Sequence, residues 1–228
     1  MIKALVFDFD GTILDTESAE YETWQEVYDR YGQELPLKEW STIVGSAGHT
    51  FDLLAHLEKL VGRPLPRDEI RAERRRRDDQ IVEVMPPREG VRELIAEARA
   101  SGIGLAIASS SPRYWVVRHL SRLGLIDAFP VIASFDETHR GKPDPAAFLL
   151  ALGELRVQAQ AAVAIEDSPN GALAAAAACL PCLVVPNPVT ARMRFPEGTR
   201  IWPSLGGVTL DAIEDLAGLP AQAEHSAD

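Results

Sequence analysis

Two aspartates at the end of an apolar run are the residues of this chain best suited to chemistry. The run Ala4 to Phe7 leads into Asp8 and Asp10, which are separated by one phenylalanine and followed at once by a glycine and a threonine. Such a run predicts a strand that is buried on both faces of a parallel sheet. Strand side chains alternate between faces, so we expect both carboxylates on the same side, about 7 Å apart or less. Like charges this close need a divalent cation between them or a shared proton.

The place of these carboxylates favours a ligand site over an ordinary turn. Open α/β sheets bind their ligands at the carboxyl ends of their strands, where Asp8 and Asp10 are predicted to lie. The alternative interpretation of the letters D-x-D-G is an exposed surface turn. The buried strand that precedes them argues against this alternative.

Two further segments carry groups that could hold an anion. Ser109 and Ser110 follow a second apolar run, which ends at Ala108. Hydroxyl and backbone N–H groups at the start of a helix form an anion site, although Ser-Ser-Ser-Pro is also an ordinary helix cap. Lys142 lies between a glycine and a proline, whose stiff backbone would aim its ammonium group at a phosphate. A solvated loop lysine is the alternative.

Glu166 and Asp167 end a third apolar run, just as Asp8 and Asp10 end the first. Neighbouring parallel strands place their ends side by side, so these acids could supply oxygen ligands to one hard cation. Mg²⁺ fits such a site, because it takes few protein ligands and leaves the rest to water and phosphate. Helix capping is the alternative role for Asp167.

The elements that must position these residues fall into two groups. Apolar residues recur at helical spacing between residues 16 and 85, with no strand candidate. After Gly90 helices and strands alternate, which predicts an α/β protein with a doubly wound parallel sheet. We expect a core domain of residues 1–15 and 86–219, a small inserted all-helical domain of residues 16–85, and a disordered tail of residues 220–228. The expected helices cover about 16–31, 36 onward, 49–61, 66–84, 91–100, 112–123, 145–152 and 170–178, and the expected later strands cover 103–108, 131–133, 162–165 and 183–185.

The bulk composition excludes several classes of partner. The chain has 228 residues, of which 46% are hydrophobic, and a formal net charge of −11. An acidic surface argues against nucleic acid and anionic membranes, and no apolar run approaches the ~20 residues of a membrane span. Because the only cysteines are Cys179 and Cys182 and the N-terminus shows no secretory pattern, we expect a cytoplasmic protein without disulfides. We also expect a monomer.

Four ordered motifs resemble those of the haloacid dehalogenase superfamily of phosphotransferases. The matching segments are Asp8-Phe9-Asp10-Gly11-Thr12, Ile107-Ala108-Ser109, Gly141-Lys142-Pro143 and Ile165-Glu166-Asp167-Ser168. The helical insertion after the first motif resembles the small cap of this family. Residues 1 to about 195 are similar to its β-phosphoglucomutase-like branch. The resemblance implies a Rossmann-like core and a Mg²⁺-dependent enzyme that acts on a small phosphorylated metabolite.

The resemblance also implies the chemical steps. Asp8 would attack phosphorus and form an aspartyl-phosphate. Asp10 would protonate the leaving oxygen and then take a proton from the incoming water. Mg²⁺ would be held by Asp8, Asp167 and the carbonyl of Asp10, with Glu166 behind them.

The phosphoryl group would be held from the other side of the site. The resemblance assigns this role to Ser109, Ser110, Lys142 and backbone N–H groups near Gly11, which would act as an oxyanion hole does. The cap would close over the site, exclude water and select the leaving group.

Two activities of this family remain to be separated. We favour hydrolysis of small organic phosphates, such as sugar phosphates, over a β-phosphoglucomutase-type mutase, because related mutases carry a histidine where this chain aligns Glu20. They also carry a cap arginine near His49 and a cap lysine near Arg77. We expect Glu20, His49 and Arg77 to face the substrate. The other arginines of residues 71–79 would form a solvated face with acidic partners one turn away.

Two hypotheses come from other functional classes. A non-catalytic phosphate-binding protein could use the same fold, and loss of the nucleophile would mark it, but Asp8 is intact. An interaction module could dock through the cap, which would require a large exposed apolar patch there.

Overall fold

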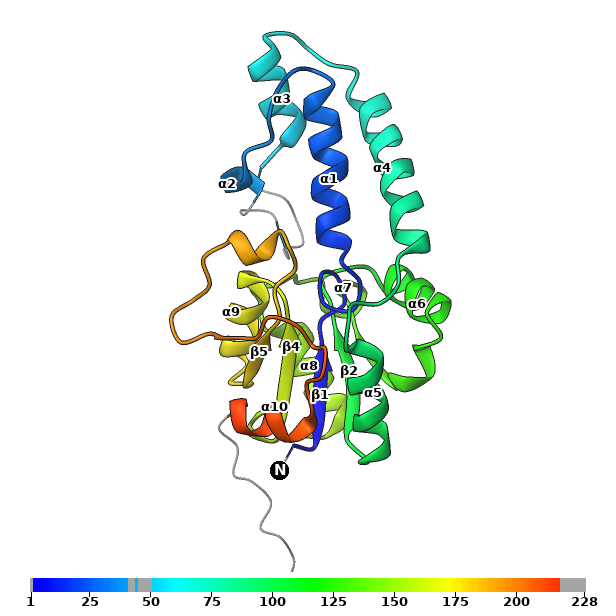
Figure 1. Cartoon of the computed structure of the whole chain (residues 1–228), viewed down its shortest axis with the longest axis vertical. Helices are drawn as coiled ribbons and strands as arrows, with labels where there is room; N and C mark the ends of the chain where they lie inside the picture. The colour runs from blue at the N-terminus through cyan, green and yellow to red at the C-terminus, as the bar shows by residue number, and fades with distance from the viewer. Residues whose placement is uncertain (1, 41–43, 45–50, 218–228) are drawn as a thin grey trace, which may run out of the picture.

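A six-stranded parallel sheet forms the centre of the molecule in the computed structural model, which describes residues 2–40, 44 and 51–217 (Figure 1). The strands are β1 (Ala4–Phe7), β2 (Gly104–Ala108), β3 (Val131–Ala133), β4 (Ala162–Glu166), β5 (Cys182–Val184) and β6 (Arg200–Ile201). Their order across the sheet is β3-β2-β1-β4-β5-β6, and every pairing is parallel. The chain therefore runs outward in both directions from β1, and the predicted doubly wound sheet is confirmed.

The two faces of the sheet bury side chains of different size. Along β1, Leu5 and Phe7 join one apolar cluster while Ala4 and Val6 join another, as the alternation of a strand requires. The second cluster takes only alanines from β2 and β4, so its helices can pack close to the strands. Helices α5 (Val91–Ala100), α6 (Arg113–Arg122) and α10 (Leu210–Ala217) contribute to the first cluster, and α8 (Ala146–Leu155) and α9 (Pro169–Ala177) to the second.

The described residues between 16 and 85 form a helical segment between the loop after β1 and the start of α5 (Figure 1). We call it the cap segment. Its helices are α1 (Thr16–Asp29), α2 (Leu37–Trp40), α3 (Leu53–Val61) and α4 (Arg67–Val84). Its large apolar side chains, such as Tyr28, Trp40 and Leu57, form a cluster of their own that also includes Val189. The described part of the cap segment contains no strand, as predicted.

The remaining elements depart from the predictions at their ends or in number. Most predicted helices and strands are confirmed with shifts of a few residues, but α7 (Phe135–Thr138), α10 and β6 had no predicted counterpart. Both residues of β6 are exposed, so no hydrophobic pattern marks that strand. The structure also contains 3₁₀ helices at Ile126–Ala128, Ala159–Ala161 and Thr190–Arg192.

The sequence predicted neither a membrane span nor a disulfide. Within the described residues, no helix combines the length and apolar character that crossing a bilayer requires. Cys179 and Cys182 are both free thiols. The predicted tail, residues 220–228, lies outside the described residues.

Candidate active site

A cavity of about 490 Å³ lies between the carboxyl end of the sheet and the cap segment. One side, which we call the sheet wall, includes Asp8, Asp10, Ser109, Ser110, Ser111, Lys142 and Ser168, with Trp115 and Arg118 of α6 beside them. The charged residues of the opposite side, the cap wall, are Glu17, Glu20, Arg74, Arg75, Asp78 and Asp79. The fold thus brings residues from three strand ends, the loop after α7 and two cap helices to one space.

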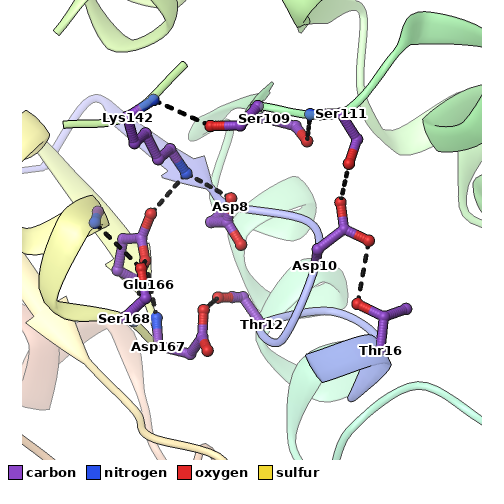
Figure 2. Close-up of polar contacts among 12 residues, drawn as sticks. Asp8, Asp10, Thr12, Thr16, Ser109, Ser111, Lys142, Glu166, Asp167 and Ser168 are labelled. Atoms are coloured by element: carbon purple, nitrogen blue, oxygen red, sulfur yellow. Dashed lines mark hydrogen bonds and ion pairs between the residues drawn. The ribbon is translucent and has the colours of Figure 1, made fainter. Parts of the chain in front are cut away.

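Asp8 occupies the centre of the sheet wall. It follows β1 directly, and its backbone N–H donates to the carbonyl of Ile165 at 2.9 Å, which holds it level with the end of β4. Its side chain is buried and forms an ion pair with Lys142 (Figure 2). Lys142 also pairs with Glu166, so one ammonium group lies between two carboxylates.

The charge of Lys142 is stabilised by these two partners. Burial alone would lower the pKa of the ammonium group, but the Asp8 and Glu166 carboxylates outweigh burial and raise it above its ordinary value. The backbone N–H of Lys142 donates to the hydroxyl of Ser110 at 3.0 Å, which fixes the loop that carries the lysine. Lys142 is therefore a permanent positive charge on the sheet wall.

Asp8 and two neighbouring carboxylates have the arrangement of a cation site. Asp8, Glu166 and Asp167 are all buried and can each offer an oxygen within 4.8 Å of the others. Burial raises the pKa of Asp8 to about 8 against the opposing effect of Lys142, and burial with the neighbouring acids raises the pKa of Asp167 well above its usual range. Oδ2 of Asp8 is buried without a hydrogen-bond partner among the described residues. A hard divalent cation would give that oxygen a partner and offset the repulsion, so these residues fit Mg²⁺.

Asp167 is held by donors from two other loops. The side chain of Asn187 donates to its Oδ2 at 2.7 Å, and the hydroxyl of Thr12 donates to its Oδ1 at 3.3 Å. Gly11 makes room for the carboxylate, because a Cβ at that position would lie 2.3 Å from Oδ2. Gly11 also has a φ of +84°, which other residues rarely adopt.

That backbone N–H groups near Gly11 hold the phosphoryl oxygens stays a prediction. The N–H of Gly11 itself donates to the carbonyl of Leu14 at 2.6 Å and closes the turn after β1. Gly11 also contributes through its missing side chain. Glu166 is similarly confined, since Gly171 approaches so closely that a Cβ would lie 1.9 Å from its carboxylate.

Asp10 lies in the loop after β1 and not on the strand, because β1 ends at Phe7. Its carboxylate is separate from the three-acid cluster and accepts hydrogen bonds from Thr16 and Ser111 (Figure 2). It also accepts a hydrogen bond from the indole N–H of Trp115. The expectation of two carboxylates stacked on one strand face is therefore wrong in detail. The turn gives Asp8 and Asp10 different partners while both still line the cavity.

Ser109 and Ser110 lie where β2 ends, as predicted. Ser109 is buried, and its Oγ accepts the backbone N–H of Ser111 at 3.0 Å, which leaves its own hydroxyl proton able to turn to a ligand. Ser110 bonds the backbone of Lys142 and so joins two loops of the sheet wall. Ser111, which was not predicted, donates to Asp10 at 2.6 Å.

The cap wall differs from the prediction in one residue. Glu20 lines the cavity and lies 3.5 Å from Arg74, as an ion pair. Arg77 does not line this cavity, since it pairs with Glu26 and its side chain is half exposed. The arginines of α4 that line the cavity are Arg74 and Arg75, and the position of Arg74 four residues after the buried Ile70 was the available signal. His49 lies outside the described residues.

Two supporting residues were missed at the sequence level. Arg88 donates to the carbonyls of Gly11, Val185 and Pro186 at 2.5, 2.8 and 2.7 Å, which joins the loop after β1 to the loop after β5. Asn187 is buried and holds Asp167. Their contacts are to backbone or to a distant loop, so no local pattern could have indicated them.

The arrangement is suited to transfer of an anionic group to a carboxylate. It combines a buried carboxylate with one free oxygen, a fixed ammonium group, a cluster of acids for a cation, and a second carboxylate held apart from the first. Neutralising groups around the reacting carboxylate are what allow one anion to approach another.

Comparison with known proteins gives the chain a family. The model of the haloacid dehalogenase-like hydrolases matches residues 2–178. YhcW of Bacillus subtilis is 41% identical over 197 residues, which cover 86% of this chain and 89% of YhcW. The phosphorylated carbohydrates phosphatase of Thermotoga maritima is 31% identical over 188 residues, which cover 78% of this chain and 82% of that protein.

Solved structures share the fold. CbbY from Rhodobacter sphaeroides, in complex with phosphate, matches with a TM-score of 0.71 and 30% identity over 94% of this chain and 100% of its own. β-Phosphoglucomutase from Clostridium difficile matches with a TM-score of 0.70 and 20% identity over 96% and 98% of the two chains. At that identity, the second match shows the fold alone.

Proposed function

The chain belongs to the haloacid dehalogenase-like hydrolase family, and on this premise we propose that it is a phosphatase that hydrolyses small phosphate monoesters, above all those of sugars, with Mg²⁺ and through an aspartyl-phosphate. The observation that carries the proposal is Asp8, a buried carboxylate at the centre of the sheet edge whose Oδ2 has no hydrogen-bond partner among the described residues. The Thermotoga maritima relative, named for phosphorylated carbohydrates, supports the substrate class.

The first half of the reaction would phosphorylate the enzyme. A carboxylate oxygen of Asp8 bonds to phosphorus while the ester P–O bond breaks. Asp10 gives its proton to the departing oxygen, which leaves as an alcohol. Lys142 and the hydroxyl of Ser109 hold the phosphoryl oxygens from the sheet wall.

The second half would return the enzyme to its starting state. Water attacks phosphorus, the bond between Asp8 and phosphorus breaks, and Asp10 takes the proton of the water. Bound Mg²⁺, held by Asp8, Asp167 and the carbonyl of Asp10, would supply positive charge that reduces the repulsion between carboxylate and phosphate. Glu166 keeps Lys142 in place behind the reacting carboxylate.

The cap segment, residues 16–85, would act as a separate domain over a core of residues 1–15 and 86–219 and select the leaving group. The cap wall carries four carboxylates and two guanidinium groups among the described residues, and Arg74 is already engaged by Glu20. An excess of carboxylates on the cap wall disfavours a second phosphate there and favours hydroxyl groups of the substrate. This supports hydrolysis of monophosphates over mutase chemistry, which must handle a bisphosphate.

The first test is phosphate release from a panel of sugar and polyol monophosphates, with and without Mg²⁺. We expect Mg²⁺-dependent release in the wild type and a loss of about 10⁴-fold or more in Asp8→Asn, because the nucleophile is removed. Asp127→Asn, which changes an exposed carboxylate far from the cavity, is the matched control and should keep full activity.

The panel includes the β anomer of glucose 1-phosphate, assayed separately for glucose 6-phosphate. Isomerised sugar phosphate with little free phosphate would show that the protein is a mutase and would overturn the phosphatase proposal. Phosphate release that persists in Asp8→Asn would exclude the aspartyl-phosphate mechanism.

A further inference from the structure

Asp10 is held by hydrogen-bond donors from three separate elements. Thr16, the first residue of α1, donates from its hydroxyl at 3.0 Å, and Ser111, in the loop after β2, donates at 2.6 Å. The third donor is the indole N–H of Trp115 on α6, at 2.9 Å. No motif of the family resemblance includes this tryptophan.

The donors are divided unequally between the two oxygens of the carboxylate. Thr16 and Trp115 both donate to Oδ1, whereas Ser111 donates to Oδ2. A hydroxyl group can rotate and accept a hydrogen bond, but an indole N–H can only donate. A proton on Oδ1 would therefore face a donor that cannot turn away, whereas a proton on Oδ2 would meet a hydroxyl that can accept it.

The indole is not free to move aside. Trp115 packs against the main apolar core, and its ring meets that of His119 edge to face with centroids 4.3 Å apart. His119 is buried, stacks on Phe9 and accepts a hydrogen bond at its Nδ1 from Arg122 at 3.4 Å. The position of the N–H is thus set by packing on its far side.

We propose that Trp115 is a positioning residue that keeps Oδ1 of Asp10 unprotonated and so makes Oδ2 the oxygen that carries the transferred proton. The proposal rests on the proposed phosphatase function. In the first half of the reaction, the proton on Oδ2 moves to the ester oxygen as its bond to phosphorus breaks. In the second half, the proton of the attacking water moves to Oδ2 as the bond between phosphorus and Asp8 breaks.

The test uses Trp115→Phe, which keeps an aromatic ring for packing and removes the N–H, on two substrates. The leaving group of glucose 6-phosphate is an alkoxide, which needs a proton as it departs. The leaving group of p-nitrophenyl phosphate is p-nitrophenolate, which departs without a proton. We expect kcat/KM for glucose 6-phosphate to fall about 10-fold or more, and kcat/KM for p-nitrophenyl phosphate to change less than about twofold.

A double-mutant comparison separates this role from a merely structural one. If Trp115 acts through Asp10, Trp115→Phe should cause no further loss in an Asp10→Asn background. Trp202→Phe, which changes a tryptophan beside β6, is the control and should leave both substrates unaffected. If Trp115→Phe does not fold, Trp115→Tyr serves as a second variant. A phenol hydroxyl can accept as well as donate, so this variant should also lose the distinction between Oδ1 and Oδ2 of Asp10.

The outcomes distinguish this proposal from the one on which it rests. Equal losses on both substrates, or a loss that persists in the Asp10→Asn background, would overturn the role of Trp115 and leave the phosphatase intact. Wild-type protein that releases phosphate from no ester of the panel, with or without Mg²⁺, would overturn both proposals.

Discussion

The two walls of the cavity are built differently, although both are rich in charge. On the sheet wall and directly behind it, Lys142, Glu166 and Asp167 are at most 3% exposed, and each charge has an ion-pair or hydrogen-bond partner. On the cap wall, the side chain of Glu20 is 33% exposed and that of Arg74 is 13% exposed. Arg75 is exposed outright.

This difference separates what the reaction needs from what selection of a leaving group needs. Buried charges with fixed partners cost free energy if any member is removed, so the sheet wall tolerates little change. Exposed ion pairs contribute only about 0–1 kcal/mol each, so the cap wall can change with little effect on folding. We therefore expect substitutions on the sheet wall to abolish the reaction and substitutions on the cap wall to alter preference.

The largest effect that would sharpen this contrast is expected at the proposed cation site. Asp167→Asn keeps the shape of the side chain but removes one charged ligand, so the Mg²⁺ concentration for half-maximal activity should rise about 10–100-fold. A titration of activity against Mg²⁺ measures this, with Asp127→Asn as the exposed control. An unchanged Mg²⁺ requirement would mean that Asp167 does not hold the metal.

A second effect concerns Asp78, a partly buried acid of the cap wall. Burial raises its pKa to about 6 against the opposing charge of Arg74, and the acids Glu20, Asp79 and Asp10 add to the rise. Because the folded pKa exceeds the ordinary value of 3.8, the neutral form stabilises the protein below about pH 4, and this stabilisation is lost as pH rises through 6.

Asp78→Asn should therefore match the wild type at pH 4 and be more stable at pH 7.5, by roughly 1–2 kcal/mol. Thermal unfolding at the two pH values measures the difference. A variant less stable than the wild type at pH 7.5 would show that the ion pair with Arg74 outweighs burial, and that the cap wall resembles the sheet wall more than we infer.

The smallest effect is a comparison of two arginines on α4. Arg74 lies over the ring of Trp24, with 5.0 Å from its guanidinium carbon to the ring centroid, and pairs with Glu20, so Arg74→Ala should lower stability by about 1 kcal/mol and alter KM. Arg77→Ala removes a half-exposed pair with Glu26 and should change stability by less than about 0.5 kcal/mol. Equal effects on KM would contradict the assignment of Arg74 as a cavity-facing arginine.

Much of the fold could be predicted because its elements leave local patterns. Buried parallel strands such as β1 and β4 are continuous apolar runs, and helices such as α5 repeat apolar residues at helical spacing. The strand β6 could not be predicted, because its two exposed residues pair with β5 through backbone alone. The four-residue α7 is too short for a periodic pattern.

The candidate site likewise contains some residues that local sequence patterns could indicate and others that they could not. Asp8, Lys142 and Asp167 could be placed in one cavity because each follows a strand end or a stiff turn, and parallel strand ends meet at one edge. Arg88 could not, since its partners are backbone carbonyls, which every residue has. Trp115 could not, because an amphipathic helix residue that faces a core looks the same whether or not its N–H meets a carboxylate.

By itself, the sequence determined the alternation of helices and strands and the charged groups at the strand ends, because both depend on neighbours a few residues away. Only the tertiary structure decided that Asp8 and Asp10, two residues apart, have different partners. The lysine that pairs with Asp8 lies 134 positions away, and the serine and tryptophan that hold Asp10 lie 101 and 105 positions away. Contacts across such separations form when strands and helices pack, and the turn after Phe7 then aims each carboxylate at its own set of donors.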